Sequence, residues 1–414
     1  MGTNKKRVVI TGMGAVSPAG NTMSETWNGI IEGKKNVGPV EIFDAEKFST
    51  NFAYQVKDFK LNRQGLTDED AKFLNRSSEF AWNAAIEAAT QSKILDKGQT
   101  NPVRTAVCLG VGVGSTPLAW HHGVYMADKL EGDEFVKVHR KNFPNTLSNL
   151  VAKLLGAKGA TSTIHTACAS SGQALGEAYE MVANGEYEVV MTGGADSMIN
   201  PFQMAGFCLL GALSSRVSDP KSASRPFDSE RDGFVLGEGA CMLVFEEYEH
   251  AKARGATILG EIVGYGVTES AYRITDLHPE GRGVIESMQM ALSDAHIKPE
   301  EVGYINAHGT STLLNDKIES LAISKVFDKT RTKVSSTKST TGHLISAAGA
   351  IEFAVAMLSL KHQVYPPSTN LKVQDPGCDV TLTPGTPTPM KSNYALSNSV
   401  GFGGSNTSLI AKRV

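Results

Sequence analysis

Short apolar runs rich in β-branched residues alternate along the chain with longer stretches in which apolar residues recur at helical spacing. The strand-like runs are 7–13, 105–111, 188–194, 258–266, 302–309 and 333–339. The helical stretches are 69–93, 168–184, 281–295 and 344–360. Such alternation is typical of α/β proteins with an at least partly parallel sheet. No low-complexity linker divides the chain, so we expect its two halves, which meet near 250–260, to pack as one unit.

Composition narrows the function classes. The formal net charge of −3 over 414 residues gives no overall field that would attract nucleic acid or an anionic membrane. The N-terminal run is read as an unprocessed strand, and no stretch is expected to approach the eighteen or so apolar residues of a membrane span. We therefore expect a cytoplasmic or organelle-matrix protein. Five scattered cysteines without a CxxC pair predict reduced thiols.

One cysteine stands apart from the others. Residues 160–167 are interpreted as a buried strand, and apolar residues recur at helical spacing from Cys168 onward, so Cys168 is predicted to begin a helix. A helix start offers unpaired N–H groups and partial positive charge, which favour a thiolate and lower a cysteine pKa. The plain alternative is a small buried hydrophobic residue. We accept that alternative for the other four cysteines and favour a nucleophile for Cys168.

Two histidine motifs add candidate chemistry. His308 follows a strand within the small, polar turn INAHGTST, and His343 stands at the entry to a helix that is apolar nearly all round. Glu352 is the lone charge in that helix, so we expect Lys338 or the histidine-bearing loop to pair with it. The alternative, a solvated stripe for Glu352, conflicts with its apolar neighbours.

The combination restricts the chemistry. A metal site is improbable on spacing, because Cys168, His308 and His343 lie far apart in the sequence and no local ligand pair exists. A single histidine would suit a Cys–His peptidase or amidase. Two histidines with a lysine instead suggest neutral imidazoles that donate hydrogen bonds to a developing enolate oxygen.

The chain resembles the elongating type II β-ketoacyl-[acyl-carrier-protein] synthases over essentially its whole length. The resemblance is carried by eight ordered blocks: RVVITGMGAVSPAGN, TACASS, TGGADSM, SRPFDSERDGFVLGEGA, INAHGTSTLLNDK, KSTTGHLISAAGAIE, PPSTNL and NSVGFGGSN. It implies a thiolase-like α/β fold of five layers, αβαβα, made of two duplicated halves. The expected halves are 1–255, with the nucleophile, and 256–414, with the histidines and the lysine.

The resemblance also implies roles. Cys168 would take the acyl chain from the carrier protein. His308 and His343 would bind the malonyl thioester and promote its decarboxylation, with Lys338 and Glu352 organising them. The N–H groups of Cys168 and Phe402 would form the oxyanion hole. The implied substrate-binding residues are Thr275, Thr310, Thr312, Phe402 and Gly403.

The same resemblance implies acyl carrier protein as partner, a homodimer, and no cofactor beyond the carrier's phosphopantetheine. A local basic patch would meet that acidic carrier; the candidates are Lys129, Lys137, Arg140, Lys141 and Arg273. Three departures stand out: Val400 replaces a phenylalanine, Arg273 replaces a histidine, and 115–150 match poorly. They motivate an alternative, a ketosynthase of a specialised polyketide or polyene pathway, possibly paired with a chain-length-factor-like subunit.

Other classes fit less well. A biosynthetic thiolase needs a second cysteine near the C-terminus, but no cysteine follows Cys378. The initiating type III synthase would have an asparagine where His343 stands. A non-catalytic chain-length subunit normally lacks the nucleophile, and Cys168 is present.

Overall fold

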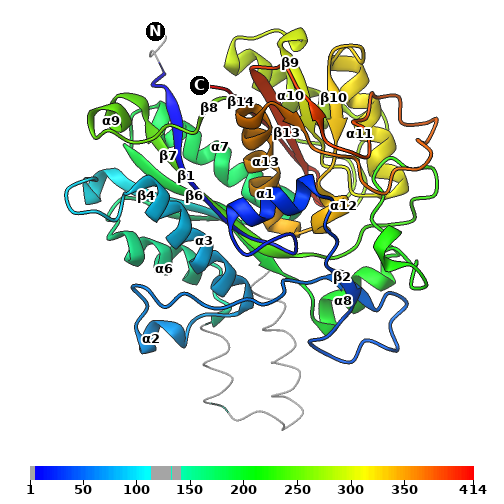
Figure 1. Ribbon diagram of the computed structural model, residues 1–414, viewed down its shortest axis with the longest axis horizontal. Coiled ribbons are helices and arrows are strands. Elements are labelled where there is room, and N and C mark those ends of the chain that lie inside the picture. The colour runs from blue at the N-terminus through cyan, green and yellow to red at the C-terminus, as the bar shows by residue number, and fades with distance from the viewer. Residues whose placement is uncertain (1–4, 113–131, 133–140) are drawn as a thin grey trace.

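The structure, a computed structural model, describes residues 5–112, 132 and 141–414 (Figure 1). Its largest sheet within these ranges has ten strands in the order β10-β9-β13-β14-β8-β1-β7-β6-β4-β5. The strands are β1 (Val8–Val16), β4 (Thr105–Val111), β5 (Thr161–Ile164), β6 (Val189–Ser197), β7 (Glu238–Glu247), β8 (Gly260–Glu269), β9 (Val302–Asn306), β10 (Lys333–Ser335), β13 (Tyr394–Val400) and β14 (Ser405–Lys412). Two-stranded sheets pair β2 (Val37–Pro39) with β3 (Phe52–Tyr54) and β11 (Val364–Tyr365) with β12 (Thr388–Pro389).

The ten strands repeat one topology twice. The order β1-β7-β6-β4-β5 in the first half corresponds to β8-β14-β13-β9-β10 in the second. In each half two antiparallel pairings are followed by two parallel ones. The halves meet where Val8–Ile10 of β1 pairs with Gly260–Ile262 of β8. The predicted boundary between residues 255 and 256 lies between the last strand of the first half and the first strand of the second.

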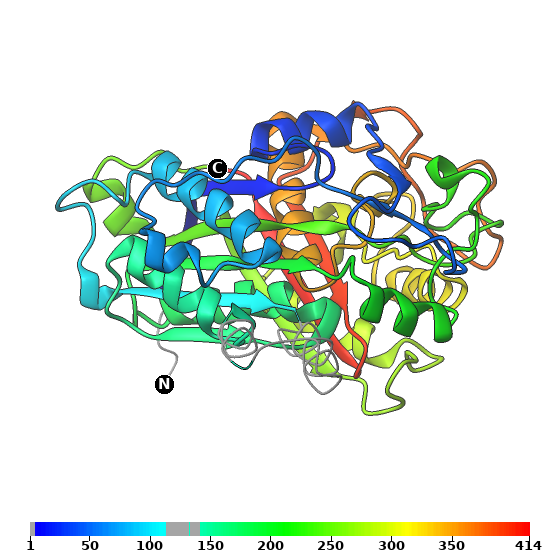
Figure 2. The same ribbon diagram turned by 90° about the horizontal axis from the view of Figure 1, so that it is seen from below.

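Helices form three layers around the strands. The helices α7 (Ser170–Ala183) and α13 (Ala348–His362) contact strands of both halves and each other, whereas α3 (Arg76–Ser92) and α6 (Thr146–Leu155) cover the first half, and α10 (Arg282–Ala295) packs on β8 and β14 of the second. Figures 1 and 2 show α13 near the centre of the molecule, beside β13 and β14. The predicted αβαβα arrangement is confirmed. The other α-helices within the described ranges are α1 (Met23–Ile31), α2 (Asp68–Ala71), α8 (Pro201–Leu209), α9 (Tyr248–Ala253), α11 (Leu313–Val326) and α12 (Lys338–Thr341).

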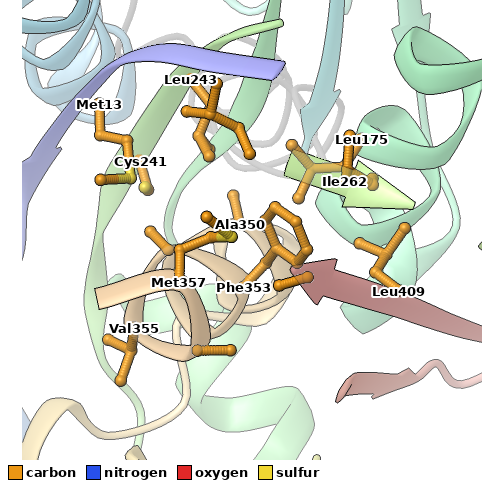
Figure 3. Packing of buried hydrophobic residues seen from close by; sticks show 14 of the residues in the cluster. Met13, Leu175, Cys241, Leu243, Ile262, Ala350, Phe353, Val355, Met357 and Leu409 are labelled. Atoms are coloured by element: carbon orange, nitrogen blue, oxygen red, sulfur yellow. The ribbon is translucent and has the colours of Figure 1, made fainter. Parts of the chain in front are cut away.

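The central core explains why α13 is apolar nearly all round. Every residue from Ala348 to Leu360 is buried. Phe353 and Met357 of this helix belong to one cluster with Leu243 of β7 and Leu175 of α7 (Figure 3). A helix enclosed between the two halves of the ten-stranded sheet has no solvent-facing stripe, so its sequence loses the amphipathic period.

Four sequence predictions differ from the structure. The run 333–339 is a strand only over Lys333–Ser335, and its last residues begin the helix α12, since the chain turns after β10. β5 is an edge strand with partly exposed residues rather than a buried one, because it ends the sheet order. The predicted helix 69–93 is two helices, since Asn75 caps a new helix at Arg76. The segment Ile345–His362 is long and apolar enough to span a membrane, contrary to expectation, but 89% of it is buried inside the protein, as in a core helix.

Candidate active site

The local backbone presents Cys168 at a sharp turn. After β5 the chain forms a short 3₁₀ helix, η2 (Ala167–Ala169), and α7 then begins at Ser170. Ala167 has φ of 48°, a left-handed conformation that few residues other than glycine adopt. Cys168 is only 6% exposed. The structure thus places the thiol at a helix start, as predicted, two residues before the α-helix proper.

Acidic side chains of α11 hold the loop that carries His308. The N–H groups of His308 and Gly309 each donate to Glu319 at 2.8 Å. Asp316, one turn earlier, accepts from the N–H groups of Thr310 and Ser311. Both carboxylates and the loop residues that donate to them are buried, so charge-assisted hydrogen bonds anchor the loop in a poorly solvated environment. The loop after β9 is therefore a rigid support for the imidazole.

His343 lies between α12 and a second 3₁₀ helix, η5 (Ile345–Ala347). Its N–H donates to the Val235 carbonyl at 2.8 Å, and its ring packs edge-on against Phe234, with centroids 5.3 Å from His308 and 5.2 Å from Phe234. The N–H of Ile345 donates to Nδ1 of His343 at 3.2 Å. Backbone and ring contacts thus fix the orientation of this imidazole.

The three predicted side chains converge. Cys168 Sγ and one ring nitrogen from each histidine all lie within 4.8 Å of one another. They line a single cavity of about 540 Å³. The two halves of the chain contribute to it jointly, because the thiol comes from the first half and both imidazoles from the second.

Lys338 and Glu352 lie directly behind the histidines. Lys338 Nζ contacts the Glu352 carboxylate, donates to the His308 carbonyl at 2.5 Å, and lies 3.3 Å from His308 Nδ1. These three partners use all three N–H donors of an ammonium group. Both side chains are 1% exposed, so the predicted pairing of the lone helix charge is confirmed, and the solvated stripe is excluded.

The hydrogen bonds define which ring nitrogens carry protons. Nδ1 of His308 faces the Lys338 ammonium, and Nδ1 of His343 faces a backbone N–H, so both Nδ1 atoms accept. In a neutral imidazole the proton then resides on Nε2. Burial and the Lys338 charge lower the pKa of both histidines well below the ordinary value. Near neutral pH the site therefore presents two uncharged N–H donors.

The thiol differs from the helix-start prediction. Burial raises the pKa of Cys168 to about 12, although Lys338 and a hydrogen bond from the Phe402 N–H act in the opposite direction. Loss of water thus outweighs the helix start in the closed pocket, and the predicted lowering of this pKa is wrong for the free site. The resting residue is a thiol.

The remaining predicted residues lie at the cavity wall. Thr275, Thr310, Thr312 and Phe402 line it. Phe402 is 38% exposed and stands in the turn between β13 and β14. Gly403, which was predicted to bind substrate, does not line the cavity, and its N–H donates to the Ile274 carbonyl at 2.6 Å. The glycines of this turn that do line the cavity are Gly401 and Gly404.

Distance alone would permit a metal ion on Cys168, His308 and His343, the one such group among the described residues. Separation along the sequence is therefore no argument against a metal ion, because the fold brings the three side chains together. The absence of a metal stays a prediction. Both Nδ1 atoms already accept hydrogen bonds, so only the Nε2 atoms and the sulfur would be available as ligands.

Sequence reasoning missed several supporting residues. No role was predicted for Glu319 or for Asp316. Their spacing of three residues on a helix places both acids on one face, which is an available signal for a shared target. Asp196 and Ser346, which hydrogen-bond beside His343, were also missed. Nothing in their local sequence indicates that they meet.

Comparisons with known proteins agree with this geometry. The family model "Beta-ketoacyl synthase, N-terminal domain" matches residues 5–251, and "Beta-ketoacyl synthase, C-terminal domain" matches 259–372. A 3-oxoacyl-[acyl-carrier-protein] synthase 2 of Synechocystis sp. is 41% identical over 411 residues, covering 99% of this chain and 98% of the relative. The protein of the same name from Vibrio harveyi is 40% identical over 420 residues, covering 99% of each.

Solved structures give the same result. A β-ketoacyl synthase from Burkholderia phymatum has a TM-score of 0.92 at 34% identity, covering 99% of this chain and all of that one. The ketosynthase in a type II polyketide synthase complex with its acyl-carrier protein has a TM-score of 0.90 at 33% identity, with the same coverage. Full-length agreement in sequence and in the five-layered architecture leaves one assignment: the chain belongs to the β-ketoacyl synthase family.

Proposed function

We propose that the protein catalyses the decarboxylative Claisen condensation of malonyl-[acyl-carrier protein] with an acyl chain bound to Cys168, giving 3-oxoacyl-[acyl-carrier protein] in fatty acid elongation. One observation carries the proposal: a thiol and two neutral N–H donors share a single buried cavity. Because both Nε2 atoms already carry protons, neither imidazole offers the thiol a free nitrogen as base, so the site suits enolate stabilisation and carbon–carbon bond formation better than hydrolysis.

The first step is acyl transfer to Cys168. Its sulfur attacks the carrier thioester, the carbonyl oxygen takes up negative charge, and the N–H groups of Cys168 and Phe402 stabilise it. The bond to the phosphopantetheine sulfur then breaks. The proton lost by Cys168 ends on the departing thiol, so no net ionisation is needed. Exchange of one thiol for another accommodates the raised pKa of Cys168.

The second step is decarboxylation. Nε2–H of His308 and of His343 donate to the malonyl thioester carbonyl. When the carboxylate leaves as carbon dioxide, the bonding pair stays on the α carbon and the enolate oxygen is held by both donors. The α carbon then attacks the acyl-cysteine, the carbon–sulfur bond breaks, and the Cys168 thiolate takes up one proton from solvent, which balances the negative charge left by the malonyl carboxylate. Lys338 and Glu352 keep the His308 tautomer throughout.

The partners follow from the same chemistry. We propose acyl carrier protein as the donor of both substrates, supported by the related ketosynthase solved with its carrier protein. No separate cofactor is required, because phosphopantetheine arrives with the carrier. We propose a cytoplasmic homodimer. Of the candidate basic residues, Arg273 is exposed but pairs with Asp276 at 3.2 Å. The carbonyl of Lys141 accepts from the Asn75 side-chain amide at 3.3 Å, and the other three candidates lie outside the described residues.

Fatty acid elongation is favoured over the specialised alternative by the relatives. Curated proteins named 3-oxoacyl-[acyl-carrier-protein] synthase 2 reach 41% identity, whereas the polyketide ketosynthase structures reach 33%, and the ishigamide ketosynthase/chain length factor 30%. Of the departures, Val400 lines the cavity, and Arg273 directly precedes Ile274 and Thr275, which line it. A partner subunit distinct from this chain stays the second hypothesis.

The test is intact-protein mass spectrometry after incubation with acyl-carrier proteins of varied chain. We expect saturated medium and long acyl groups to remain on Cys168, and release of 3-oxoacyl product once malonyl-carrier protein is added. Retention of unsaturated or oxygenated chains alone would transfer the assignment to the specialised pathway. No adduct with any chain, in a folded protein, would overturn the condensation.

A further inference from the structure

The turn that presents Cys168 has a counterpart in the second half. There β10 leads through α12 to η5 and α13, as β5 leads through η2 to α7. Ile345 opens η5 with φ of 47°, matching the 48° of Ala167 at the same place in η2. Ser346 therefore stands in the second half where Cys168 stands in the first. Its hydroxyl group donates a hydrogen bond to a carboxylate.

That carboxylate belongs to Asp196, near the end of β6 in the first half. Its Oδ2 accepts from the Ser346 hydroxyl at 2.8 Å and from the Ser346 N–H at 3.1 Å, while Oδ1 accepts from the Ser197 N–H at 2.9 Å. Asp196 is 5% exposed and Ser346 1%. Among the described residues Asp196 forms no salt bridge, so hydrogen bonds alone satisfy this buried carboxylate.

Asp196, in β6, caps the start of η5, which belongs to the other half of the chain. Neither η5 nor α13 has a side-chain cap of its own. Unpaired N–H groups and the positive end of the helix dipole favour an anionic group at such a start. Asp196 meets both demands across the interface between the halves. Its carboxylate also packs against Gly112, where a Cβ atom would lie 2.2 Å from Oδ2, so the side chain is confined.

The cap acts on His343 through one residue. Ser346 follows Ile345, whose N–H donates to His343 Nδ1. Ile345 is in a left-handed conformation, which is unfavourable for a β-branched residue and is kept only if the surrounding structure enforces it. If η5 relaxes, the hydrogen bond to Nδ1 is lost. The proton of the ring is then free to move to Nδ1, and Nε2 ceases to be a donor.

We infer that Asp196, through Ser346, is a positioning residue for His343: it caps η5 from the opposite half and so keeps the Ile345 N–H on Nδ1. This inference rests on the proposed function, because it concerns the step in which Nε2–H stabilises the enolate. It assigns no chemistry to Asp196 itself, which does not line the cavity that holds Cys168.

Asp196 also affects the pKa of Cys168, and this effect disfavours acylation, whereas the cap on η5 favours decarboxylation. Its negative charge contributes to the raised pKa of that thiol. Removing the charge makes the thiolate easier to form while it loosens His343. Asp196→Ala is therefore expected to slow decarboxylation and to leave acylation unchanged or faster. A merely structural role would slow both steps together.

The experiment measures the two half-reactions separately on the full chain. Acylation is followed as the mass adduct on Cys168 with acyl-carrier protein, and decarboxylation as carbon dioxide released from malonyl-carrier protein. Loss of one buried hydrogen bond predicts about a tenfold slower decarboxylation for Ser346→Ala, and loss of the whole cap about ten- to a hundredfold for Asp196→Ala. Asp196→Asn keeps one acceptor and is expected to be intermediate.

Ser359→Ala is the matched control. Ser359 is buried in α13, the helix that follows η5; its hydroxyl donates to the Val355 carbonyl at 2.8 Å, and it lies 16 residues from His343 along the chain. We expect its decarboxylation to stay within about twofold of the parent. Equal loss of both half-reactions in the Asp196 and Ser346 variants, or no more loss than in the control, would overturn the inference. Absence of decarboxylation in the parent protein would instead overturn the proposed function.

Discussion

Replacing Lys338 by methionine separates the two tasks of this side chain. Lys338 neutralises Glu352 inside the protein and donates to Nδ1 of His308. Methionine fills a similar volume without charge or donors. The variant thus leaves a buried carboxylate without its cation and an imidazole without the contact that fixes its tautomer.

The size of the effect on stability depends on pH. Glu352 has a pKa raised from 4.5 to about 7 by burial, and Lys338 lowers it, so its removal raises this pKa further. A folded-state pKa above the unfolded value means that the folded protein binds more protons, and stability falls as pH rises through that window. Relative to the parent, the additional loss of folding free energy in Lys338→Met begins near pH 7 and grows by up to about 1.4 kcal/mol per pH unit. At pH 9 it reaches about 3 kcal/mol, the lower end of the cost of breaking a buried ion pair.

The assay is urea denaturation at pH 6, 7 and 9 at fixed protein concentration, with malonyl decarboxylation measured beside it. We expect Lys338→Met to unfold at progressively lower urea than the parent as pH rises. Adding Glu352→Gln removes the buried charge, so the double variant is expected to lose the extra pH dependence. It should not regain decarboxylation, because Nδ1 of His308 still lacks its donor.

Two results would refute this reasoning. A stability deficit of equal size at pH 6 and pH 9 would mean that ionisation of Glu352 is not its cause. Recovery of decarboxylation in the double variant together with stability would mean that Lys338 serves the fold alone.

Three further predictions concern the site and the fold. Cys168→Ala should abolish the acyl adduct and condensation while malonyl decarboxylation continues, as seen by mass spectrometry and carbon dioxide release. His308→Ala should lower condensation by about 10²–10³-fold, whereas His362→Ala, which removes a ring stacked on Trp27 outside the cavity, should change the rate by less than about twofold. Glu87, whose pKa burial raises to about 7, should destabilise the fold as pH rises from 4.5 to 7, so Glu87→Gln should flatten the thermal stability profile across that range; an unchanged slope would exclude this group.

Much of the fold could be predicted from local pattern. The strand β4 and the helices α7 and α10 lie within two residues of the predicted segments, and β6 runs three residues past its predicted end, because periodicity and flanking glycines mark these elements. β7 was not predicted, although residues 238–247 hold a continuous apolar run. Such a run is compatible with strand or helix, and only its place between β1 and β6 decides.

The site residues likewise divide into those that local sequence indicates and those that only the fold brings together. Cys168, His308 and His343 could be found because each stands at an element boundary beside small residues. The pairing of Glu352 followed from the cost of a lone buried charge. The pKa of Cys168 could not be predicted, since it depends on how completely the pocket excludes water. Asp196 and Ser346 are 150 residues apart in the sequence, and their contact is a property of how the halves meet.

Among the strands that the structure describes, the pairing of Val8–Ile10 with Gly260–Ile262 is the one place where the two halves share a strand ladder. Sulfur stands on one side of this seam and both imidazoles on the other. Catalytic turnover consequently depends on the alignment of two halves that share one hydrophobic core. Substitutions in this ladder are expected to lower turnover by shifting one half against the other, under conditions in which the protein is still folded.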